Sequence, residues 1–95
     1  MELCMYCTVG LIRIGVACTN WSGDAPVYGF VKHHAQPERV VLLKGAPRDP
    51  WVALRSYAEQ VLATRLSAAL SRCKMAPVPE VIRSAPELPE PDAES

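Results

Sequence analysis

The amino-acid sequence predicts an α/β domain with a small parallel sheet. Two apolar runs, residues 9–19 and 40–43, are rich in β-branched side chains and have the composition of buried strands. The segment between them has the apolar spacing of a helix, and a longer segment of the same kind follows the second run. Two strands joined by a crossover helix are parallel and the crossover is right-handed. We therefore expect a β-α-β unit followed by a long C-terminal helix.

Length and charge set the outer limits of this prediction. The chain has 95 residues, enough for one small domain, and 49% of them are hydrophobic, which argues against a wholly disordered protein. Ten basic residues balance ten acidic ones, but five of the acids follow residue 75. Residues 1–75, the predicted domain, are therefore mildly basic, which permits contact with a phosphate backbone.

The first predicted strand, residues 9–19, is a nearly continuous apolar run of the kind found in strands covered on both faces. Residues 1–8 are open to two interpretations, a third strand or a loose terminus. Within them, Cys4 and Cys7 have the CxxC spacing of zinc and redox motifs, yet too few further ligands stand at paired spacing. Small apolar filler residues and a zinc or thiol switch are thus both considered for this pair.

The helix predicted over residues 24–36 begins at Asp24, whose carboxylate suits an N-cap, and Pro26 fits the first turn. Pro37 marks its end. Its apolar face follows the spacing i, i+3, i+4, i+7 and consists of Val27, Phe30, Val31 and His34. The helix leads into the second strand, residues 40–43.

The carboxyl ends of parallel strands lie at one edge of the sheet, where α/β folds bind their ligands. Here that edge is expected to gather Thr19, Asn20, Trp21, Lys44 and Gly45.

The long helix is predicted over residues 48–74, with Asp49 as N-cap and Pro50 in the first position. Its apolar stripe comprises Trp51, Leu54, Ala58, Leu62, Leu66, Ala69 and Cys73. The stripe is expected to pack on the sheet. A homodimer through the 50–74 helix is the alternative, because a small sheet leaves apolar surface uncovered.

Residues 76–95 contain five prolines and five acids without a periodic apolar pattern, and they predict a disordered tail. No secretory leader is evident, and polar residues interrupt the apolar run near the N-terminus. The sequence therefore predicts a cytoplasmic protein with free thiols that does not enter a membrane.

Two residues are candidates for chemistry. Asp24 is the acid nearest the end of the first strand, where ribonuclease-H-type nucleases hold a divalent ion with carboxylates. It is a candidate metal ligand for Mg²⁺ or Mn²⁺, with a plain N-cap as the alternative. Lys44, at the end of the second strand, is a candidate phosphate-binding residue or a solvated strand-end lysine. A P-loop motif is missing from the sequence, so it gives no support for ATP binding.

A series of short motifs runs through the middle third of the chain: an acid, a VY pair, an FV pair, a histidine, an RV pair and a strand ending in KG. They are carried by Asp24, Val27, Tyr28, Phe30, Val31, His34, Arg39, Val40, Leu42, Leu43, Lys44 and Gly45. This series resembles a segment of the nuclease domain of phage terminase large subunits of the GpA type. The resemblance implies a ribonuclease-H-like fragment related to viral DNA packaging, with DNA as a partner.

The same resemblance implies loss of catalysis. Members of that family carry a metal-binding acid at the end of the preceding strand, whereas the matching positions here are Cys18, Thr19 and Asn20. The remaining nuclease carboxylates and the ATPase half have no counterpart in this sequence. We therefore expect a truncated or remnant nuclease fragment without activity; any residual activity would rest on Asp24 and Lys44 with Mg²⁺ or Mn²⁺. A small interaction module that oligomerises through its long helix is the alternative function.

Overall fold

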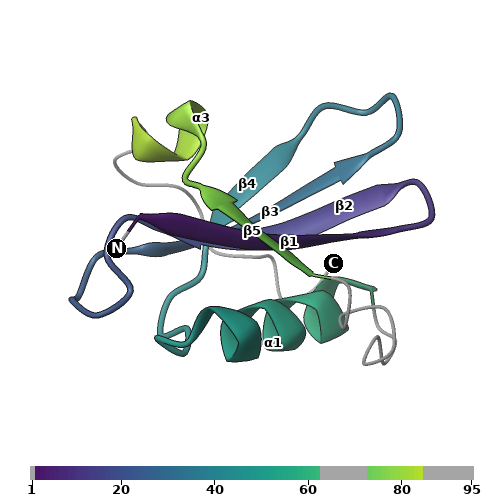
Figure 1. Cartoon of the computed structure of the whole chain (residues 1–95). Helices are drawn as coiled ribbons and strands as arrows, with labels where there is room; N and C mark the ends of the chain where they lie inside the picture. Colours follow the sequence, from purple (N-terminus) through teal and green to yellow (C-terminus); the bar gives the residue numbers. More distant parts are fainter. Residues whose placement is uncertain (1, 63–72, 85–95) are drawn as a thin grey trace.

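The structure is a computed structural model that describes residues 2–62 and 73–84, and its strands form one antiparallel sheet in the order β4-β3-β2-β1-β5 (Figure 1). One helix lies below this sheet and a short helix lies above it. The strands are β1 (Leu3–Val9), β2 (Ile12–Cys18), β3 (Val27–His33), β4 (Arg39–Leu42) and β5 (Lys74–Pro77). The helices are α1 (Pro50–Leu62) and α3 (Glu80–Arg83).

The first predicted strand proves to be part of a hairpin. Gly10 and Leu11 form a tight turn between β1 and β2, and Gly10 has the positive φ of 61° that such a turn requires. The third strand considered for residues 1–8 is confirmed as β1. The strand predicted over residues 9–19 begins too early, because the apolar run continues through the turn into β1.

The helix predicted over residues 24–36 is wrong, because this segment contains β3, which pairs antiparallel with both β2 and β4. The reason is burial on both faces: Val27 through Phe30 are all buried, so the strand has no polar alternation to distinguish it from a helix. Asp24 consequently caps no helix. The predicted parallel β-α-β crossover is wrong for the same reason, since short connections link antiparallel neighbours.

Helix α1 covers one face of the sheet (Figure 1). Asp49 caps it as predicted, because its Oδ1 accepts the N–H of Val52 at 3.1 Å. The predicted stripe packs on the sheet through Leu54 and Ala58, both fully buried. Residues 63–72 lie outside the described residues. The prediction of helix up to residue 74 is wrong at its end, because Lys74 begins β5.

Tyr57 of α1 joins the helix closely to the centre of the sheet. A Cβ atom built on Gly29 would stand 2.6–2.8 Å from three carbons of the Tyr57 ring. Only a residue without a side chain allows the ring to lie against β3 at this distance. The core under α1 comprises Cys7, Ile14, Val16, Cys18, Trp21, Val27, Ala53, Leu54, Tyr57 and Ala58.

The opposite face is covered in part by the segment that contains β5 and α3. Val78 and Ile82 are buried there against Cys4, Tyr28 and Phe30. The disordered tail predicted from residue 76 is therefore wrong for residues 76–84; residues 85–95 lie outside the described residues. Burial of apolar side chains on the sheet outweighs the proline content that suggested disorder.

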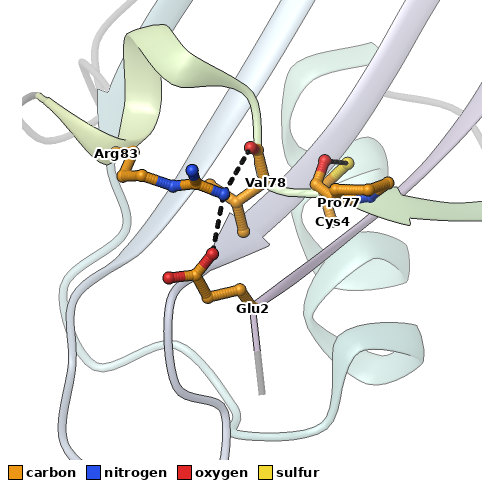
Figure 2. A network of polar contacts seen from close by, with 5 residues as sticks. All are labelled: Glu2, Cys4, Pro77, Val78 and Arg83. Atoms are coloured by element: carbon orange, nitrogen blue, oxygen red, sulfur yellow. Dashed lines mark hydrogen bonds and ion pairs between the residues drawn. The ribbon is translucent and has the colours of Figure 1, made fainter.

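Polar contacts fasten this segment to β1 (Figure 2). Arg83 Nη2 donates to Glu2 Oε1 at 2.7 Å and to the Val78 carbonyl at 3.4 Å, while the Cys4 thiol donates to the Pro77 carbonyl at 3.5 Å. The side chains of the Arg83–Glu2 pair are 44% and 49% exposed, so the pair adds at most about 1 kcal/mol. Burial of Ile82 is the larger contribution, of roughly 1.5–3 kcal/mol.

Candidate functional site

The candidate site lies at the end of the sheet where β2 and β4 finish. These strands flank β3 and both run antiparallel to it, so they point in the same direction. The loop after β2 and the loop after β4 enclose a hollow of about 470 Å³, and both Asp24 and Lys44 line it. The structure thus brings the two candidate residues together at one end of the sheet, although the strands that precede them are not neighbours.

Arg48 is the residue that organises this end, and sequence reasoning missed it. Its Nη2 donates to the Asn20 carbonyl at 2.8 Å, its Nη1 to the Ala25 carbonyl at 2.8 Å, and its Nε to the Trp21 carbonyl at 3.3 Å. Nη2 also approaches Cys18 Sγ at 3.6 Å. Three of the five guanidinium donors are therefore used on carbonyls of the loop after β2, and a fourth is directed to Cys18 at the end of that strand.

The acceptors around Arg48 are neutral, so its positive charge is not cancelled within the loop. The one ion pair found among residues 2–62 and 73–84 joins Arg83 and Glu2, on another part of the molecule. Arg48 lines the same hollow as Lys44. Two cationic side chains and one carboxylate, Asp24, therefore surround a hollow whose other lining residues are uncharged.

The loop after β2 is held firmly in place. Trp21 is buried and its Nε1 donates to the Leu3 carbonyl at 2.8 Å, while the Gly23 N–H donates to the Asn20 carbonyl at 3.2 Å. The Ser22 hydroxyl donates to Asn20 Oδ1 at 3.0 Å. These bonds fix the position of the backbone carbonyls to which Arg48 donates. The position of the Arg48 guanidinium is therefore fixed as well.

Lys44 stands on a tight turn between β4 and α1. The Ala46 N–H donates to the Leu43 carbonyl at 3.3 Å, and Gly45 has a φ of 73° that favours glycine. Lys44 is exposed, and its ammonium makes no hydrogen bond or ion pair with the described residues. It is therefore available to a ligand from solvent.

A second hollow, of about 290 Å³, lies between the same turn and α1 and is lined by Lys44, Ser56, Tyr57 and Gln60, among others. Burial raises the pKa of the Tyr57 phenol to about 12, and the charge of Arg39 only partly offsets this rise. The Tyr57 hydroxyl is therefore neutral at physiological pH and serves as a hydrogen-bonding group rather than as a base.

The residues present do not fit a magnesium or manganese centre. These ions take about six oxygen ligands, usually including more than one carboxylate. Asp24 is the single carboxylate in the lining of the hollow, and no group of three His, Cys, Asp or Glu side chains suited to a metal occurs in the part of the chain that the structure describes.

The CxxC pair does not form a joint site either. Cys4 and Cys7 are three residues apart in a strand, so their thiols lie on opposite faces of the sheet. Cys7 instead contacts Cys73 by a side-chain hydrogen bond, because β5 runs beside β1. Burial raises the pKa of both Cys4 and Cys7, and that of Cys73 to about 12. These thiols remain protonated, which suits apolar packing better than metal binding.

The chain matches no protein-family model, no curated protein and no solved structure. The similarity to GpA-type terminases therefore stays a prediction. Most of the residues that carry it lie in the β3–β4 hairpin rather than in a helix and a strand, whereas Asp24, Lys44 and Gly45 lie in the loops before and after this hairpin. Within the described residues, no helix has the length and apolar character needed to cross a bilayer.

Proposed function

We propose that the protein binds the phosphate backbone of DNA and does not cut it. The binding surface is the end of the sheet where β2 and β4 finish, called the loop end below. The observation that carries this proposal is the pair of cations, Lys44 and Arg48, beside one hollow at that end. Arg48 is held in place by the loop, and Lys44 is exposed and reaches into solvent. Arginine and lysine side chains form charge-assisted hydrogen bonds with phosphate oxygens, which makes phosphate a suitable ligand for Arg48 and Lys44.

The composition of the hollow supports binding rather than catalysis. Phosphodiester cleavage by metal ions needs several carboxylates to hold one or two ions beside the scissile bond. Asp24 is the one carboxylate in the lining, and it lies beside two cations. The resemblance to terminases, whose substrate is DNA, points to the same partner and to the same loss of activity.

The test is a titration of a fluorescent DNA duplex with the protein over a series of salt concentrations. We expect the logarithm of the binding constant to fall linearly with the logarithm of salt, and Lys44→Gln to reduce that slope by about 1. Lys74→Gln, which removes an exposed lysine on the far edge strand, is the matched control and should leave the slope unchanged.

Two results would contradict the proposal. One is a binding constant that does not respond to Lys44→Gln. The other is cleavage of the duplex in Mg²⁺ or Mn²⁺ that Asp24→Asn abolishes, which would assign a catalytic role to the loop end.

The alternative function, oligomerisation through the long helix, has less support. The apolar side chains of α1 that would form a seam, such as Leu54 and Ala58, are buried against the sheet. The exposed large apolar side chains in the described part of α1 are Val52 and Val61, at 36% and 39% exposure, and they are nine positions apart along the helix. A homodimer through residues 50–74 therefore stays a prediction that no particular contact favours.

A further inference from the structure

The edge strand β4 presents main-chain hydrogen-bonding groups that β3 does not use. The Leu43 N–H donates to the Val27 carbonyl at 2.8 Å, which fixes the alternation of the β3–β4 ladder. In an antiparallel ladder the next residue along points its N–H and C=O the other way. By this alternation Val40 and Leu42 direct their N–H and C=O groups toward the outer edge of the sheet.

The two edges of the sheet differ in how they resist pairing with another strand. β5 carries Lys74 and ends in Pro77, a charge and a residue without an N–H, both of which discourage strand addition. β4 begins with the exposed Arg39 but contains no proline, and its other residues, Val40, Val41 and Leu42, are half-buried and apolar. An edge strand without proline, with three consecutive apolar residues, accepts an added strand more readily than β5 does.

We propose that β4 pairs antiparallel with β4 of a second copy, so that two sheets join across a two-fold axis. The axis passes beside Val41, and Val40 faces Leu42 of the second copy on both sides of it. This register aligns the outward N–H and C=O groups of all four residues. A two-fold arrangement uses the same edge of both chains and therefore closes as a dimer.

Charge complementarity selects this register. Both charged residues lie outside the four-residue ladder, Glu38 just before β4 and Lys44 on the turn just after it. This register brings the Glu38 side chain near the long side chain of Lys44 of the second copy, and the symmetry repeats the pair at the other end of the seam. Sliding the strands by one hydrogen-bonded step in either direction sets Glu38 against Leu42 or against Ala46, and neither offers a positive charge. Opposite charges that face each other across an antiparallel pair are favourable, and like charges are unfavourable.

Both charged groups are available within the chain itself. Lys32, which faces Glu38 by continuation of the β3–β4 register, directs its ammonium to the carbonyls of His34 and Gln36 at 2.7 and 2.5 Å. The ion pair found among the described residues, Arg83–Glu2, involves neither Glu38 nor Lys44. Within the part of the chain that the structure describes, neither charge is therefore paired. Lys44 is also the cation that the proposed function assigns to phosphate, so DNA and a second copy compete for it.

The test is sedimentation equilibrium of the full chain up to about 1 mM, because a seam of four residues per chain is small and the dimer is expected to be weak. Glu38→Lys and Lys44→Glu should each weaken the dimer roughly tenfold, since each sets like charges against each other twice. The double variant Glu38→Lys/Lys44→Glu restores opposite charges and should dimerise within about threefold of the original chain. Lys74→Glu, on the opposite edge, is the control and should have no effect.

Val40→Pro provides a second, independent arm. This substitution removes an outward-pointing N–H that makes no hydrogen bond to β3, so the sheet should be retained while the dimer is lost. Circular dichroism measures whether the sheet is retained. A chain that is monomeric at about 1 mM overturns the proposal. So does a dimer that Val40→Pro leaves intact, or a charge-swapped double variant that stays as weak as the single ones.

Discussion

The effect of Gly29→Ala on stability distinguishes the observed strand β3 from the helix that the sequence predicts for the same residues. In the middle of a helix, alanine is more stable than glycine by about 1 kcal/mol. In β3 the added Cβ would stand 2.6, 2.7 and 2.8 Å from carbons of the Tyr57 ring, where ordinary contact begins at 3.4 Å. The sign of the effect therefore depends on the fold.

The cost follows from what can move. Tyr57 is 4% exposed and is held by α1, but its ring also borders the 290 Å³ hollow and has some room to shift. Overpacking of this kind costs about 1–3 kcal/mol, and partial relief places Gly29→Ala in the middle of that range. For a domain of this size each kcal/mol lowers the melting temperature by roughly 4–8 °C, so a fall of about 10 °C is expected.

Thermal and urea unfolding followed by circular dichroism measure this change. Tyr57→Leu removes the ring. In that background Gly29→Ala should lower the free energy of unfolding by clearly less, because the effects of substitutions at contacting residues are not additive. An increase in the stability of Gly29→Ala would refute the strand assignment. An equal loss of stability in both backgrounds would refute the contact with Tyr57.

Two further predictions concern the loop end and α1. Arg48→Met removes the donors to the carbonyls of Asn20, Trp21 and Ala25, so it should lower the free energy of unfolding by about 2–3 kcal/mol in urea titrations, whereas the exposed Arg55→Met should change it by less than about 0.5 kcal/mol. The second concerns pH. Burial raises the pKa of Tyr57 from 10 to about 12, so above pH 10 the unfolded chain loses a proton that the folded chain retains, and stability falls as the pH rises from 10 to about 12. Tyr57→Phe should show a shallower loss over this interval, and identical slopes for the two proteins would contradict the buried phenol.

Local features of the fold follow from short stretches of sequence. The β-branched runs that become β2 and β4, and the Asp49-Pro50 start of α1, depend on backbone preference and capping. Those effects act over a few residues and do not require knowledge of the neighbours. The buried stripe of α1 is predictable for the same reason, because its periodicity is a property of one segment.

The identity of β3 depended on the layers around it. With α1 on one side and the α3 segment on the other, both faces of the strand are apolar, and the alternation that marks a strand disappears. Once this segment is a strand, antiparallel pairing follows and the crossover is lost. The ordered conformation of residues 74–84 likewise depends on a sheet face against which Ile82 is buried, and that face exists only after folding.

The candidate site divides in the same way. The sequence by itself determined that Asp24 and Lys44 follow apolar runs, and hence that both lie at strand ends. Tertiary structure alone decided that Arg48 joins them, because its partners are backbone carbonyls 23–28 residues away along the chain. Every residue type has a backbone carbonyl, so the sequence does not show which carbonyls accept hydrogen bonds from Arg48. The path of the loop brings these carbonyls to the guanidinium.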